Sequence, residues 1–309
     1  MVFRISHGTV VLLLGIATAA SFLVSGGGWI SGFLYALVLL LAERLTGLTA
    51  YGSRADSRLW FTGIFLALSP ALLASQLSTA YLSGLLLAVG ALYAAVKLMD
   101  KGGDSWMLLL LLSGTAALLF DIRLAGLLLP VALQLPLMNS GRKNLWHRVI
   151  AMLPAITFTA ATVLSENLTE LIASWSFDGF TGAGGSTSVA ADPPGLLYII
   201  YPLAHPWFCV LLPLLLLLYR RTDLINPARR MLLSGALVYL VLIGGLPERA
   251  FYRLIPAYVI LLTAVFPSWD RIYCYGLYFF KKTVWLATGV LILTQVVMIY
   301  FKVAGQYQF

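Results

Sequence analysis

Long apolar runs separated by short polar turns dominate the sequence and recur from one end of the chain to the other. Backbone groups in lipid must bond within their own segment, so apolar runs of this length are expected to be helices. The pattern therefore predicts an all-α fold, a polytopic membrane bundle of about eleven transmembrane helices. The expected spans are 8–25, 29–43, 59–75, 80–97, 106–120, 124–138, 148–165, 195–219, 231–245, 252–267 and 283–301.

Some of these spans have two interpretations. The first follows Met1–Arg4 and contains the small residues Ala17–Ala20, a pattern that signal peptides share. We prefer an uncleaved first helix, because the run is long enough to span. The runs 106–120 and 124–138 are short, so they form either a tight hairpin or a shallow re-entrant pair.

The positions of the basic residues give the orientation. With a cytoplasmic N-terminus and alternating spans, all but four of the 20 Lys and Arg residues fall inside, as the positive-inside rule requires. The C-terminus is then outside. The four external basic residues are Arg123, Arg249, Arg253 and Lys302.

Composition supports a membrane protein. The mean hydropathy is +0.92, and 10% of residues are charged, against about 25% in soluble proteins. The net charge of +8 comes from short loops beside apolar runs, where it favours insertion, so we expect no nucleic-acid partner. Residues 1–309 are expected to form one transmembrane domain in a bacterial inner membrane.

The longest external loop, 166–194, is acidic and rich in Gly and Ser, and we expect it to be mobile. The three histidines occur singly, so no metal site and no cofactor are predicted. Glu166 and Glu170 are four residues apart, a spacing that suits an acid–base pair or a divalent cation on a helix. The alternative is a solvated helix end.

The external arginines are the strongest candidates for a binding site. Arg123 lies in a tight turn between two apolar helices, and Arg249 and Arg253 have the i, i+4 spacing that places two side chains on one helical face. The planar guanidinium suits phosphate oxygens, so the three predict a site for a lipid phosphate or pyrophosphate. The alternative is that they are interface anchors, with Arg123 paired to Asp121 and Glu248 to an arginine.

The stretch from about 29 to 138 resembles the GT-C superfamily, membrane glycosyltransferases that use polyprenyl-phosphate-linked sugars. The resemblance is carried by Ala42-Glu43-Arg44-Leu45-Thr46-Gly47, by Leu68–Leu73, and by Gly114–Arg123 with Gly126–Pro130. It implies that Arg123 lies near the lipid phosphate, and the segment Arg249–Pro256 is similar to the family's arginine-bearing entry to a late helix.

The chain departs from the family in its first external loop, where the catalytic acid is expected. That loop, Ser25–Gly28, holds no carboxylate, so another external acid would have to replace it. The external acids are Asp121, Glu166, Glu170, Asp178, Asp192 and Glu248, and we take Asp121 and Glu166 as the candidate catalytic acids. The chain also resembles O-antigen polymerases, which rely on external arginines, and uncharacterised polytopic proteins of Bacteroidetes-type bacteria.

These features predict a protein of envelope glycan assembly that binds a polyprenyl-phosphate-linked saccharide at its outer face. Its expected partners are membrane lipid, this saccharide and other membrane proteins. One alternative is a non-catalytic subunit or scaffold of a larger complex. Another is a transporter or flippase, which the shortage of ionisable residues deep in the spans disfavours.

Overall fold

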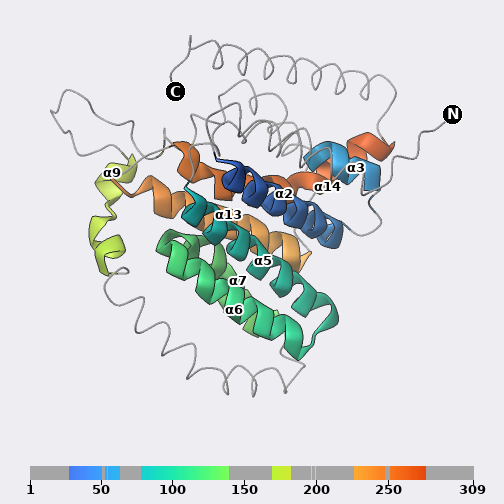
Figure 1. Cartoon of the computed structure of the whole chain (residues 1–309), viewed down its shortest axis with the longest axis horizontal. Coiled ribbons are helices and arrows are strands. Elements are labelled where there is room, and N and C mark those ends of the chain that lie inside the picture. The colour runs from blue at the N-terminus through green and yellow to red at the C-terminus, as the bar shows by residue number, and fades with distance from the viewer. Residues whose placement is uncertain are drawn as a thin grey trace, which may run out of the picture. The chain divides into compact units, whose positions relative to one another are not determined.

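The structure is a computed structural model, shown in Figure 1. Its described residues are 28–50, 53, 55–62, 78–138, 169–181, 196, 199, 226–247 and 251–275. All regular structure in these ranges is helical, which confirms the all-α prediction. Three described helices are long and apolar enough to cross a membrane, namely α2 (Trp29–Thr49), α5 (Thr79–Lys101) and α13 (Pro227–Gly244). They mark the chain as a membrane protein.

The remaining elements are shorter or lie between these helices. They are α3 (Ala55–Phe61), α6 (Asp104–Phe120), the 3-10 turn η2 (Ile122–Leu124), α7 (Ala125–Met138), α9 (Phe177–Thr181), the 3-10 turn η3 (Phe251–Leu254) and α14 (Ile255–Tyr275). The predicted spans 8–25, 148–165 and 283–301, nearly all of 195–219 and most of 59–75 lie outside the described residues. The count of about eleven spans therefore stays a prediction.

The chain divides into two compact units. The first unit comprises residues 1–82, 203–225 and 262–309, and the second comprises 83–202 and 226–261. In the first unit, α2 packs against α3, and Phe61 lies 5.2 Å from the ring of Phe266 in an edge-to-face contact. Trp269 lies beside the same ring, so an aromatic cluster joins α3 to α14.

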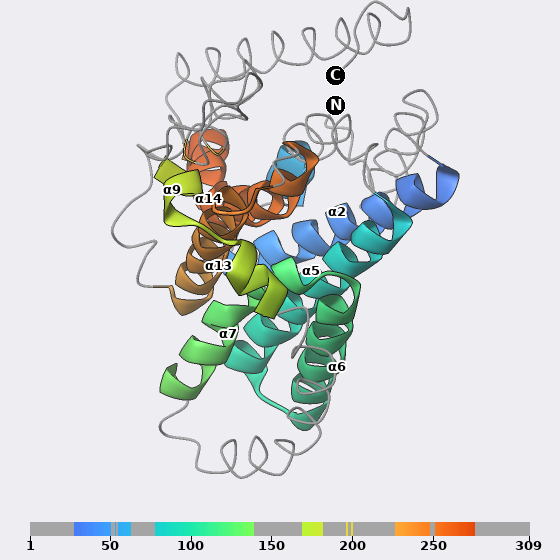
Figure 2. The same ribbon diagram turned by 90° about the vertical axis from the view of Figure 1, so that its left-hand side faces the viewer.

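In the second unit, α5, α6 and α7 lie side by side (Figure 2). Tyr93 of α5 meets Trp106 of α6 edge to face at 5.9 Å. A Cβ added at Gly84 would lie 2.9 Å from Cβ of Phe120, so this glycine permits the close approach of α5 to the end of α6.

The backbones of α7 and α13 approach each other closely in the second unit. A Cβ at Gly126 would lie 2.8 Å from Cα of Tyr239, and one at Gly235 would lie 2.8 Å from the carbonyl oxygen of Leu127. Each helix thus supplies one glycine to the contact. Helix α13 begins at an Asn226 cap, whose side-chain oxygen accepts the N–H groups of Ala228 and Arg229.

Several element bounds differ from the predicted ones. Helix α2 continues to Thr49, beyond the predicted end at residue 43, because Glu43 and its neighbours are paired within the protein. Helix α14 continues through Pro267 to Tyr275. Within the predicted loop 166–194, residues 169–174 and α9 are helical.

Candidate functional site

A pocket of about 540 Å³ lies in the second unit, where three segments distant in sequence come together. They are the turn between α6 and α7, the helical residues 170–174, and a region after α13 that supplies Leu246, Pro247 and Arg253. Its charged side chains are Asp121, Arg123, Glu170 and Arg253, and we call it the arginine pocket. Leucines and Phe120 supply much of the remaining wall.

The turn between α6 and α7 places Asp121 and Arg123 on this pocket. Helix α6 ends where Asp121 adopts an extended backbone conformation, and its Oδ1 accepts the backbone N–H of Arg123 at 2.9 Å. The carbonyl oxygen of Asp121 accepts the N–H of Leu124, which closes η2. The aspartate thus fixes the backbone from which the arginine extends.

Arg253 is held by the packing of η3. Its carbonyl oxygen accepts the hydroxyl hydrogen of Tyr239 at 3.0 Å, and Tyr239 is fully buried on α13. The next two residues, Leu254 and Ile255, are also fully buried. The backbone of Arg253 is therefore anchored, while its half-buried side chain lines the pocket.

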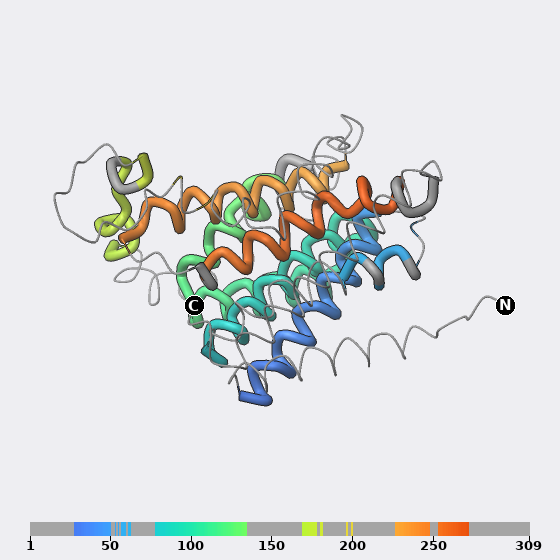
Figure 3. Tube along the Cα trace, turned by 90° about the horizontal axis from the view of Figure 1, so that it is seen from above, coloured from blue at the N-terminus to red at the C-terminus, as the bar shows by residue number. Residues whose placement is uncertain are grey.

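The segment 169–181, which we call the docked segment, brings Glu170 and Ser174 to the pocket. Figure 3 shows it in yellow-green at the end of α13, in orange. The indole Nε1–H of Trp175 donates to the carbonyl oxygen of Val241 at 3.3 Å, and the N–H of Ser176 donates to that of Gly245 at 3.0 Å. Two hydrogen bonds thus tie this segment to the C-terminal end of α13.

Two adjacent glycines make room for the docked segment. A Cβ at Gly245 would lie 1.8 Å from Nε1 of Trp175, and one at Gly244 would lie 2.9 Å from Cε2 of Phe180. No other residue type fits under these rings without moving them. The pair Gly244-Gly245 is visible in the sequence, but nothing local to it indicates which aromatic rings it receives.

The electrostatics of the pocket centre on Asp121. Burial raises the pKa of its carboxyl group above the ordinary value, because the charged form loses solvation. The hydrogen bond from the N–H of Arg123 and the positive charges of Arg123 and Arg253 act in the opposite direction and lower it. Both guanidiniums are therefore close enough to Asp121 for their charges to act on its carboxylate.

The arginine pocket contains three of the residues that the sequence singles out, Asp121, Arg123 and Arg253. Glu166 and Arg249 lie outside the described residues. Glu170, predicted only as the companion of Glu166, is itself a pocket residue. No group of three or more His, Cys, Asp and Glu residues that could hold a metal ion occurs in the described ranges.

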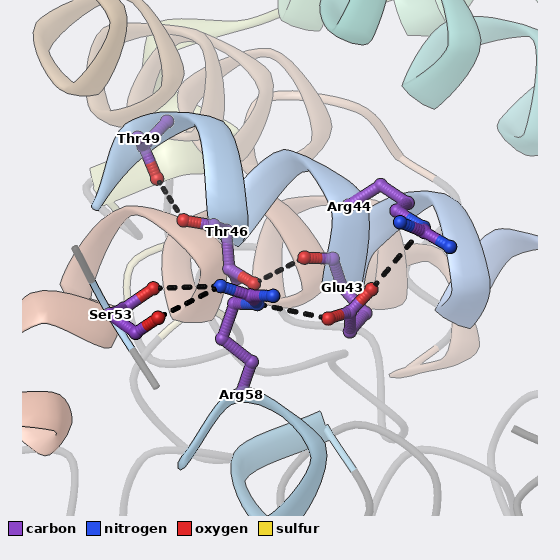
Figure 4. A network of polar contacts seen from close by, with 6 residues as sticks. All are labelled: Glu43, Arg44, Thr46, Thr49, Ser53 and Arg58. Atoms are coloured by element: carbon purple, nitrogen blue, oxygen red, sulfur yellow. Dashed lines mark hydrogen bonds and ion pairs between the residues drawn. The ribbon is translucent and has the colours of Figure 1, made fainter. Parts of the chain in front are cut away.

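A second polar cluster lies in the first unit, at the end of α2 (Figure 4). Nε of Arg58 donates to Oε1 of Glu43 at 3.0 Å, and its Nη1 donates to the carbonyl and hydroxyl oxygens of Ser53. The Glu43 side chain is 5% exposed. These bonds join α2 to α3 and their connection, so we interpret the cluster as a structural brace for the motif Ala42–Gly47.

The end of α6 adds an apolar surface beside the arginine pocket. Leu119 and Phe120 line the pocket and are 56% and 49% exposed. A ligand with a charged head and an apolar chain could contact both kinds of surface.

No protein-family model, curated protein or solved structure matches this chain. The residues of the arginine pocket are therefore the basis for a proposal about its function.

Proposed function

We propose that the arginine pocket binds the phosphate of a membrane lipid, and specifically that of a polyprenyl-phosphate-linked saccharide used in envelope glycan assembly. The observation that carries the proposal is the convergence of Arg123 and Arg253 on one pocket from the two separate sequence segments that make up the second unit. Two guanidiniums can share the oxygens of one phosphate, and each can donate two hydrogen bonds to it.

The apolar wall supports a lipid rather than a soluble phosphate. Leu119 and Phe120 are exposed next to the turn that carries Arg123, as are Leu112 and Leu108 further along α6. In a membrane these side chains would contact lipid chains. A polyprenyl chain could lie along α6 while its phosphate lies on the arginines.

The orientation follows from the charge pattern of the sequence. Arg123 and Arg253 are basic residues on the face where the positive-inside rule disfavours them. Binding of an anionic ligand would explain why arginines occur there. The proposed site is therefore on the outer face of a bacterial inner membrane. This is where the resemblance to the GT-C superfamily also places the lipid phosphate.

If the bound saccharide is transferred, Asp121 is the acid–base group within the pocket. A raised pKa makes its carboxylate a stronger base than an exposed aspartate, suited to accept the proton of an acceptor hydroxyl. As the sugar–phosphate bond breaks, Arg123 and Arg253 would stabilise the charge on the departing lipid phosphate. Asp121→Asn should then abolish transfer while leaving lipid binding intact.

The binding proposal is tested by native mass spectrometry of the gently purified protein and its variants Arg123→Ala and Arg253→Ala. We expect a polyprenyl-phosphate species on the wild type and at least a tenfold loss in each variant, because each guanidinium contributes charged hydrogen bonds. Arg230→Ala is the matched control. Arg230 is exposed near the start of α13, about 20 Å along the helix from the pocket end.

Equal retention of lipid by the wild type and both pocket variants would contradict the proposal. The arginines would then be interface anchors, and a non-catalytic membrane subunit would be the function to test. Arg123→Lys refines the result, because lysine keeps the charge but lacks the planar fork. We expect it to restore only part of the binding that Arg123→Ala loses.

A further inference from the structure

Among the described residues that line the arginine pocket, positive and negative side chains are equal in number. Its described lining includes two cations, Arg123 and Arg253, and two carboxylates, Asp121 and Glu170. A phosphate that entered with no other charge would make the site net negative. In a partly buried site an unbalanced charge is costly, because water screens it poorly. The balance therefore favours a ligand that brings a positive charge together with its phosphate.

The positive charge has a specific place to bind. Glu170 and Ser174 both line the pocket and are four residues apart in a helical stretch, so their side chains lie on one face. The hydroxyl of Ser174 donates to the carbonyl oxygen of Leu171 at 3.0 Å, which leaves its lone pairs as acceptors. A carboxylate and a hydroxyl acceptor suit the three N–H donors of a primary ammonium group.

Asp121 has a different neighbourhood from Glu170. Its Oδ1 accepts the backbone N–H of Arg123, and the charges of Arg123 and Arg253 act on it. Asp121 thus belongs to the phosphate-binding side of the pocket. Glu170 belongs to the docked segment, which Trp175 and Ser176 hold against α13. Glu170 and the two arginines with Asp121 therefore come to the pocket from different parts of the chain.

We propose that the ligand of this pocket is a zwitterionic lipid head group, with its phosphate on Arg123 and Arg253 and a primary amine on Glu170 and Ser174. This inference rests on the proposed function and narrows its substrate class to amine-bearing lipid phosphates. Glu170 is then the residue that determines specificity. The arginines determine whether a lipid phosphate binds at all.

The test compares defined lipids of identical acyl chains, added to the delipidated full-length protein and measured by native mass spectrometry. Phosphatidylethanolamine carries a phosphate and a primary amine, phosphatidylglycerol a phosphate and hydroxyls, and phosphatidylcholine a cation without N–H donors. We expect phosphatidylethanolamine to bind the wild type about threefold more tightly than either of the others, as one partly exposed ion pair allows. Glu170→Gln should remove this preference, while Arg123→Ala should weaken all three lipids.

The outcomes separate this inference from the proposed function. Equal or tighter binding of phosphatidylglycerol to the wild type, still lost in Arg123→Ala, would overturn the zwitterionic ligand and leave the phosphate site standing. A preference for phosphatidylethanolamine that survives Glu170→Gln would overturn the role of Glu170. Binding unaffected by Arg123→Ala would overturn both proposals. Glu170 is exposed and glutamine has its shape, so we expect the variant to fold normally.

Discussion

At the scale of single residues, charged side chains serve two different purposes in this protein. Glu43 and Arg58 are buried together, with side-chain exposures of 5% and 18%, and their bonds stay within the protein. Arg123, Glu170 and Arg253 line a pocket instead. The sequence alone does not separate these roles, because both sets lie at the ends of apolar runs.

The Glu43–Arg58 pair should matter for stability. Arg58→Gln removes the nearer and more buried of the two cations beside the Glu43 carboxylate, and we expect a loss of about 3 kcal/mol in the free energy of unfolding. Denaturation of the detergent-solubilised protein, followed by circular dichroism, measures this loss. Arg44→Gln is the matched control. Arg44 is 60% exposed and lies 3.7 Å from the same carboxylate, so its loss should cost less than about 1 kcal/mol.

Comparable losses in Arg44→Gln and Arg58→Gln would contradict this interpretation of the cluster. The double variant Glu43→Gln with Arg58→Gln provides a further check. Removing both charges eliminates the uncompensated buried carboxylate, so the double variant should be more stable than Arg58→Gln alone.

At the scale of elements, hydrophobic runs predict the helix bounds well where each helix consists almost entirely of apolar residues. The runs 80–97, 106–120 and 124–138 correspond closely to α5, α6 and α7. The prediction is wrong at the end of α2, where the Arg58 partner lets a polar stretch remain helical. It also gives no indication of the docked segment, whose position depends on glycines far away in the chain.

The docking of this segment depends on Gly245. A Cβ there would lie 1.8 Å from Nε1 of Trp175, while the backbone at Gly245 is ordinary right-handed helical. Gly245→Ala should therefore displace the ring by contact alone and break the hydrogen bond to Val241. We expect faster hydrogen exchange across residues 169–181 and a loss of the preference for phosphatidylethanolamine, because Glu170 moves with the segment.

Gly114→Ala is the control for this substitution. Its added Cβ would meet its nearest neighbours at 3.8 and 3.9 Å, which is ordinary contact. Alanine also favours the helix by up to about 1 kcal/mol, so this variant should be as stable as the wild type or more stable. Unchanged exchange in residues 169–181 of Gly245→Ala would show that the segment is not held at this point.

At the scale of the whole molecule, the sequence indicates candidate residues for the site but not how they come together. Arg123 and Arg253 attract attention because they break the charge rule that the other basic residues follow. Their convergence on one pocket depends on the close approach of α7 and α13 at Gly126 and Gly235, which brings the α6–α7 turn beside the end of α13. Such long-range contacts have no local signal in the sequence.

The orientation in the membrane is the prediction on which the proposed function depends most. Helix α6 separates Asp104 from Phe120 by about 25 Å, so the α5–α6 connection near Lys101 and the arginine pocket should lie toward opposite faces. We replace Cys209 and Cys274 by serine and introduce Ala173→Cys or Lys101→Cys, both at exposed positions. A membrane-impermeant maleimide applied to intact bacterial cells should label Ala173→Cys, and should label Lys101→Cys only after permeabilisation. The positive-inside rule gives the direction, because Lys97 and Lys101 belong to a basic connection while residues 166–194 contain no Lys or Arg. The reverse labelling pattern would place the arginine pocket in the cytoplasm, where an externally presented saccharide could not reach it.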